Sequence, residues 1–162
     1  MKKILMILTL ALFVSCSDST TDPVDKNATK VDIAKLSSQP GFETYQSSYD
    51  SYTPNPDYVD SLKSVYNSAD DKFYIYMKLD CQCNASTKLF PRMMKTIDAA
   101  GISHDNINMY IMLDETYNYP EKDFITVTDL PQLFLKNDKN IIDVTSTPDS
   151  VLVESVLYQA FK

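Results

Sequence analysis

Two cysteines, Cys81 and Cys83, stand two positions apart inside residues 73–91, FYIYMKLDCQCNASTKLFP. The residues before them are apolar and aromatic, as in a buried strand, and those after them have helical periodicity. A thiol at a strand-to-helix junction lies beside the helix N-terminus, where unpaired N–H groups and the helix dipole favour the thiolate. The residue types and their position therefore predict a nucleophilic or redox-active cysteine.

Thiol–disulfide exchange needs one thiolate that attacks and a second thiol that releases the mixed disulfide. A disulfide between Cys81 and Cys83 closes a very small ring, so we expect it to be strained and relatively oxidising. The preceding Asp80 would raise the pKa of both thiols if its carboxylate lies close to them.

Metal binding is a second class of chemistry for this pair, because two neighbouring thiolates are soft donors that select Cu(I). The chain also holds one histidine, His104, and further sulfur atoms at Met77, Met93, Met94, Met109 and Met112. Most of these methionines fall on apolar stripes, which is typical of core packing. We therefore expect no cofactor and no metal site, and keep Cu(I) binding by Cys81 and Cys83 as an alternative.

The surrounding sequence predicts the elements that hold the cysteines. Apolar spacing indicates a helix over 58–67 with Asp57 as its N-cap, and a helix after Cys83 that ends before Gly101. A closing helix is expected to begin at Thr147-Pro148-Asp149. Strands are predicted at 73–79, 109–113, 130–135 and 141–144, the last two joined by a hairpin turn at 137–140.

This order of elements predicts an α/β fold. The early alternation of strand and helix implies two parallel strands, and the late hairpin adds antiparallel ones. We expect a three-layer sandwich with a mixed sheet of about four strands and helices on both faces.

The N-terminus has the pattern of a targeting segment. Lys2 and Lys3 precede an apolar run at 4–14 that is too short to span a bilayer as a helix. The run ends in Phe13-Val14-Ser15-Cys16, which resembles a bacterial lipobox and implies cleavage before Cys16 and lipidation of its thiol. The alternative is an ordinary signal peptide that leaves Cys16 as a free thiol. We expect a signal peptide over 1–15, a lipidated flexible tether over 16–41 and one domain over 42–162.

The charge limits the partners. The chain carries a formal charge of −7, and removal of 1–15 would take away two lysines. An acidic chain without a basic cluster argues against nucleic acid and against electrostatic docking on anionic lipid. The lipid on Cys16 would be the membrane anchor. The expected location is the cell envelope, facing the periplasm or the cell surface, where disulfides are permitted.

A cysteine after the first buried strand and a proline opening the third resemble the thioredoxin fold. The segments Cys83-Asn84-Ala85-Ser86, Pro91-Arg92 and Tyr49-Asp50-Ser51-Tyr52-Thr53-Pro54 resemble thioredoxin-like lipoproteins of Bacteroidetes-type bacteria. The resemblance covers about 42–162. It implies that Cys83 is the nucleophile, that Ser86 replaces the resolving cysteine, and that Cys81 is a possible resolving thiol. It also implies that a cis Pro131, with Leu130, faces the thiol and binds substrate.

The resemblance therefore implies a membrane-anchored protein that exchanges disulfides with protein thiols. Gln82 stands where thioredoxins usually have tryptophan, and Met77 where many have a buried acid. A non-catalytic thioredoxin-like binding module is the alternative function.

Overall fold

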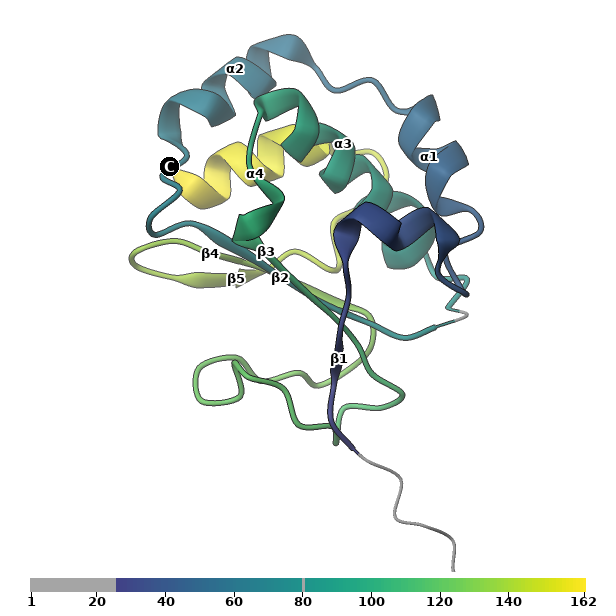
Figure 1. Ribbon diagram of the computed structural model, residues 1–162. Coiled ribbons are helices and arrows are strands. Elements are labelled where there is room, and N and C mark those ends of the chain that lie inside the picture. The colour runs from purple at the N-terminus through teal and green to yellow at the C-terminus, as the bar shows by residue number, and fades with distance from the viewer. Residues whose placement is uncertain (1–25, 80) are drawn as a thin grey trace, which may run out of the picture.

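Five strands form one mixed sheet in the order β1-β3-β2-β4-β5 (Figure 1). The computed structural model describes residues 26–79 and 81–162. The central pair β2–β3 is parallel, and the pairs β1–β3, β2–β4 and β4–β5 are antiparallel. The strands are β1 (Thr29–Lys30), β2 (Lys72–Met77), β3 (Ile107–Ile111), β4 (Gln132–Lys136) and β5 (Ile141–Asp143). The mixed sheet is confirmed, and β1 is the strand that the sequence did not predict.

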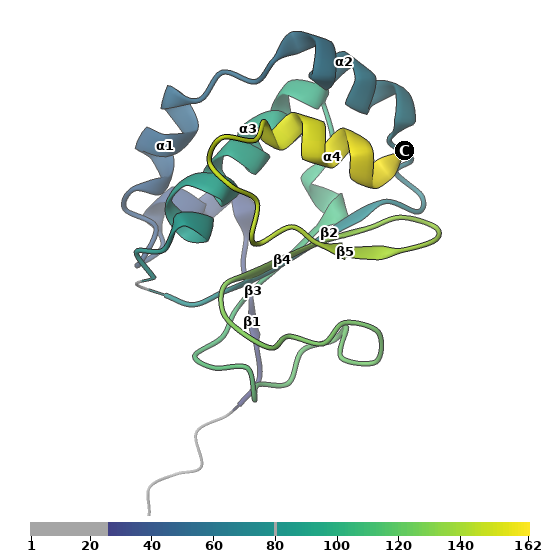
Figure 2. The ribbon, with the colours of Figure 1, turned by 180° about the vertical axis from the view of Figure 1, so that it is seen from behind.

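Four α-helices lie together on one face of this sheet, as the two opposite views show (Figures 1 and 2). They are α1 (Tyr45–Ser51), α2 (Pro56–Val65), α3 (Phe90–Ala100) and α4 (Val153–Phe161). Three short helical turns accompany them: the 3-10 turns η1 (Ile33–Ser38) and η3 (His104–Asn106), and the π-helical turn η2 (Ala85–Leu89). Helix α3 connects the parallel strands β2 and β3, as the strand–helix–strand pattern predicts.

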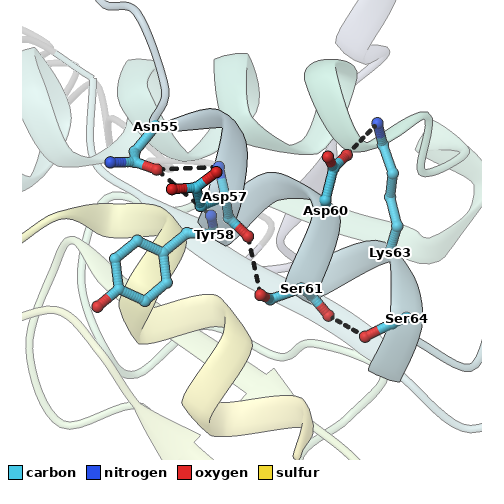
Figure 3. Close-up of polar contacts among 7 residues, drawn as sticks. All are labelled: Asn55, Asp57, Tyr58, Asp60, Ser61, Lys63 and Ser64. Carbon is cyan, nitrogen blue, oxygen red and sulfur yellow. Dashed lines mark hydrogen bonds and ion pairs between the residues drawn. The ribbon is translucent and has the colours of Figure 1, made fainter.

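The helix ends have specific causes. The side chain of Asn55 accepts hydrogen bonds from the backbone N–H groups of Asp57 and Tyr58, so α2 begins at Pro56 (Figure 3). The prediction that Asp57 caps this helix was wrong, because Asp57 lies in the first turn, where a carboxylate complements the helix dipole. Helix α3 ends as predicted at Gly101, whose φ of 69° is accessible to glycine at little cost. Helix α4 begins only at Val153, later than expected.

The main core lies between the sheet and the four helices. Strand β2 contributes Phe73, Ile75 and Met77 to this face, all at most 1% exposed. Apolar residues of every α-helix pack against them, including Tyr45, Leu62, Met94, Ile97, Leu157 and Phe161. Alternate side chains of a strand point to opposite faces, so Tyr74 and Tyr76 of β2 point away from the helices. A different segment must cover them.

The second face of the sheet is covered by an irregular segment. Tyr74 and Tyr76 of β2 and Tyr110 of β3 form a separate cluster. Their partners from the chain between β3 and β4 are Tyr117, Tyr119, Ile125 and Val127. This segment contains no helix. The expectation of helices on both faces was therefore wrong, because this segment has buried apolar residues without helical spacing.

The folded part of the chain begins well before Phe42. Strand β1 pairs with β3, and Leu36 in η1 is 1% exposed within the main core. The predicted tether over 16–41 thus includes residues that belong to the fold. Thr29 pairs with Ile111, and Ile111 pairs with Met77, so β1 enters at the sheet edge where β2 ends. Among the residues described, no helix is long and apolar enough to cross a membrane.

Candidate functional site: the cysteine pair

The two cysteines form a disulfide between β2 and the helix that follows it. Cys81 and Cys83 are bonded through their sulfur atoms, with their Cα atoms 5.3 Å apart. Strand β2 ends at Met77 and η2 begins at Ala85, so the pair lies at the predicted strand-to-helix junction. Both side chains are only half-buried. Part of each cysteine is therefore exposed to solvent.

Cys83 is tied into the first turn of the helix. Its carbonyl oxygen accepts hydrogen bonds from the backbone N–H of Thr87 at 3.0 Å and from the Thr87 hydroxyl at 2.9 Å. The Ser86 hydroxyl lies 3.4 Å from the Cys83 sulfur. A disulfide sulfur has no hydrogen, so Ser86 is the donor in this contact. The structure thus brings together Cys81, Cys83 and Ser86.

The helix runs without a break from the cysteines through Pro91. The first part, η2, is a π-helical turn, and the backbone N–H of Phe90 bonds to the carbonyl of Ala85. Proline has no N–H to donate, and its ring clashes with the carbonyl four residues earlier in an α-helix. A wider turn before Pro91 relieves that conflict, as π-turns do in other helices. The predicted helix between Cys83 and Gly101 is confirmed, and Pro91 lies inside it.

Pro131 lies at the same edge of the sheet as the end of β2. The Leu130–Pro131 peptide bond is cis, as expected. Tyr76 of β2 pairs with Gln132 of β4, so the next positions, Met77 and Pro131, are neighbours beyond that pair. Pro131 is buried and Leu130 is half-buried. The four described site residues Cys81, Cys83, Ser86 and Pro131 thus come from one end of the central strands.

A charged cluster that the sequence did not indicate lies beside the first turns of this helix. The Asp149 carboxylate is 2.5 Å from Lys88 Nζ and 3.8 Å from Arg92 Nη1. The hydrogen bond from Lys88 holds the pKa of Asp149 below its usual value, and the Asn84 side chain acts in the same direction. Arg92 also lies over the Tyr52 ring, with its guanidinium carbon 5.4 Å from the ring centre. The sequence pattern at Thr147-Pro148-Asp149 predicts only a helix start.

The methionines and His104, the other candidate metal ligands, lie in different surroundings. Met77, Met93, Met94, Met109 and Met112 are all at most 1% exposed, which fits core packing. His104 bonds through Nε2 to Asp98 at 2.7 Å, and Asp98 also accepts from the Tyr49 hydroxyl. Within 26–79 and 81–162, no group of three or more His, Cys, Asp or Glu side chains is placed to hold a metal ion. Cys16, the predicted lipidation site, and Asp80 lie outside the described residues.

Comparison of the chain with protein-family models, with curated proteins and with solved structures gives no match.

Proposed function

We propose that this chain is a thioredoxin-like protein that exchanges disulfides with protein thiols. The observation that carries the proposal is the half-buried Cys81–Cys83 disulfide, placed between the central strand β2 and the start of a long helix. A structural disulfide usually connects distant parts of a chain, whereas this one spans two positions and closes no long loop. Its position at a helix N-terminus suits a reactive thiolate.

Cys83 is the better candidate for the nucleophile. Its backbone belongs to the first helical turn, so it is the cysteine closer to the unpaired N–H groups. When the disulfide is reduced, the Ser86 hydroxyl can donate its hydrogen bond to the Cys83 thiolate. A donor to the charged form lowers the pKa of the thiol. Cys81 then serves as the resolving thiol, because the chain offers no cysteine at position 86.

The exchange balances without a further reactant. In the reduced protein, the Cys83 thiolate attacks one sulfur of a substrate disulfide and forms a mixed disulfide, and the other substrate sulfur leaves as a thiolate. The Cys81 thiolate then attacks the Cys83 sulfur, restores the Cys81–Cys83 disulfide and releases the second substrate sulfur. The substrate gains two electrons and two protons, and the cysteine pair loses them. The reverse sequence oxidises a substrate dithiol.

The substrate surface in this proposal includes Leu130 and Pro131. They stand at the start of β4, on the sheet edge from which the chain continues to the cysteines. The half-buried Leu130 offers an apolar contact there, and Pro131 has no N–H that a substrate would have to satisfy.

The location is part of the proposal as well. We propose that Cys16 carries a lipid and that the protein acts in the bacterial cell envelope, where a disulfide is permitted. Radiolabelled palmitate added to expressing cells should label the full chain. The Cys16→Ser variant should take up no label and should no longer be found in the membrane fraction. Equal labelling of wild type and Cys16→Ser would remove the lipoprotein assignment.

The test of the exchange function is insulin reduction by dithiothreitol, together with a redox titration of the protein against glutathione. Wild type should accelerate insulin reduction and titrate as a two-electron couple. Cys83→Ser should abolish the acceleration of insulin reduction and the two-electron titration. Cys81→Ser should keep formation of a mixed disulfide with glutathione but lose turnover. Ser64→Ala, which changes an exposed hydroxyl on α2, is the matched control and should behave as wild type. A wild-type protein without any acceleration would instead favour a non-catalytic binding module.

A further inference from the structure

We propose that Asp149 restrains the reactivity of the Cys83 thiol by neutralising Lys88 beside the first turn of the cysteine-bearing helix. The inference rests on the proposed function only in taking Cys83 as the attacking thiol. Asp149 acts on Cys83 through Lys88, without a contact to the sulfur atoms, and is therefore a positioning residue. Its effect is electrostatic, through the charge that the helix start presents to the thiolate.

The geometry places Asp149 against three residues of that helix. Its carboxylate bonds to Lys88 at 2.5 Å and lies 3.8 Å from Arg92, and its backbone oxygen accepts from Arg92 at 3.5 Å. The Asn84 amide, next in sequence to Cys83, also interacts with this carboxylate. Asp149 is thus in contact with the residue that follows Cys83 and with the cation one turn further on.

The sign of the effect follows from the charges. Lys88 and Arg92 together carry two positive charges, and Asp149 cancels one of them. A cation near a thiol favours the thiolate, and an anion disfavours it. Removing the Asp149 charge takes an anion away from the helix start and frees Lys88. The pKa of Cys83 should then fall, and the thiol should react faster at neutral pH.

Other charged groups of the described chain have partners of their own. Lys78 follows β2 and is exposed, and its charge acts on the Asp114 carboxylate after β3. Arg92 is held over the Tyr52 ring, and Tyr52 donates to Glu154 of α4. The substitutions tested below leave Lys78, Tyr52 and Glu154 in place, whereas Asp149→Asn also removes the carboxylate that lies 3.8 Å from Arg92.

The experiment measures the rate of alkylation of Cys83 by iodoacetamide from pH 5 to pH 10. The full chain with Cys81→Ser keeps Cys83 as a free thiol, and peptide mass spectrometry separates its product from that of Cys16. Asp149→Asn should lower the Cys83 pKa by about half a unit, the size expected of a partly exposed charge. Below the pKa this gives a rate about twofold higher, because the larger thiolate fraction is partly offset by lower intrinsic nucleophilicity.

Two further variants separate a charge effect from a change of structure. Lys88→Gln should shift the pKa upward, because Asp149 then loses its closest cation, and the double variant should return close to the starting value. Asp60→Asn is the matched control, because Asp60 also pairs with a lysine, Lys63, but on α2 (Figure 3). Asp60→Asn should leave the pH dependence of Cys83 alkylation unchanged. All shifts should shrink at 1 M salt, since exposed charges are then screened.

Equal pKa values for the Asp149→Asn and parent proteins at low salt would overturn the proposal, as would shifts of the same sign for Asp149→Asn and Lys88→Gln. Alkylation needs no protein substrate. A protein that fails to reduce insulin but shows the opposite shifts would therefore refute the proposed function and leave this inference standing.

Discussion

The hydroxyl of Tyr52 donates a 2.5 Å hydrogen bond to the carboxylate of Glu154, and this carboxylate is completely buried. Its second oxygen accepts the backbone N–H of Asn55 at 2.7 Å. One side chain at the start of α4 therefore fixes the linker between α1 and α2. The same Asn55 caps α2, and the same Tyr52 ring supports Arg92 next to the cysteine-bearing helix.

Replacement of Glu154 should destabilise the fold in proportion to the acceptors that are lost. Glu154→Ala leaves the Tyr52 hydroxyl and the Asn55 N–H without their partner, and should lower the free energy of unfolding by about 3 kcal/mol. Glu154→Gln keeps one acceptor oxygen and should cost about 1 kcal/mol. Urea unfolding followed by circular dichroism measures both. Ser155→Ala is the control on the same helix, and a Glu154→Ala protein as stable as this control would contradict the role of the carboxylate.

The second face of the sheet depends on another buried carboxylate, Glu121. It accepts hydrogen bonds from the hydroxyls of Tyr76 and Tyr110, both at 3.0 Å, and is 7% exposed. Glu121→Ala leaves two buried hydroxyls unpaired, and we expect a loss of about 3 kcal/mol in unfolding free energy. Exposed Lys122→Ala should change stability by less than about 0.5 kcal/mol. Similar urea midpoints for the two variants would show that the tyrosine hydroxyls find other partners.

The raised pKa values of Tyr66 and Tyr76 predict a loss of stability at alkaline pH. Burial, followed by the charge of Asp71, raises the pKa of Tyr66 to about 12, and burial together with Glu121 raises the pKa of Tyr76 further. An unfolded tyrosine ionises near pH 10, so the stability from these groups is complete below pH 10 and is lost as pH rises toward 12.

Urea midpoints at pH 8, 10 and 11 test this expectation, with absorbance at 295 nm reporting tyrosinate. The midpoint should fall above pH 10, and part of the tyrosinate signal should appear only on unfolding. Tyr76→Phe, whose side chain does not ionise, should reduce the fall. A midpoint that stays constant from pH 8 to pH 11 would contradict the raised pKa values.

The contact between Ser86 and Cys83 predicts a slower thiol when the hydroxyl is removed. In the Cys81→Ser background, Ser86→Ala takes away a hydrogen-bond donor to the thiolate, so the pKa of Cys83 should rise and alkylation at pH 7 should slow by about threefold. Stopped-flow alkylation gives the rate, with Ser64→Ala as the control. An unchanged rate would mean that the hydroxyl turns away from the sulfur once the disulfide is reduced.

Much of the helix-side architecture could be predicted from local pattern. The apolar spacing in α2 and α3, Gly101 after α3, and the strand before Cys81 are signals that neighbouring residues carry themselves. The continuous apolar and aromatic run before Cys81 is typical of a strand that is buried on both faces. The sequence does not predict which segment covers the second face of the sheet. The buried residues of that segment follow neither helical nor strand spacing: Tyr117, Tyr119, Ile125 and Val127.

Local sequence patterns do not predict features that exist only through tertiary contacts. Strand β1 has two exposed residues and no periodic signal, and it exists because it pairs with β3. Asp149 is close to Asn84 and Lys88 only because the chain before α4 passes that helix. The resemblance to thioredoxin-like proteins implies that Cys83 is the nucleophile, but nothing in the sequence locates the charges beside its helix.

The residues just before β1 have a consequence for orientation at a membrane, because Lys26 and Ala28 bond to Thr116 and Asn118 of the irregular segment between β3 and β4. Lys26 is ten positions after Cys16, and an extended chain of that length reaches at most about 35 Å. With a lipid on Cys16, this irregular segment would be the part of the fold to which the lipid-bearing chain leads (Figure 1). Such an anchor would confine disulfide exchange to partners whose cysteines lie within the length of this connecting chain plus the width of the fold.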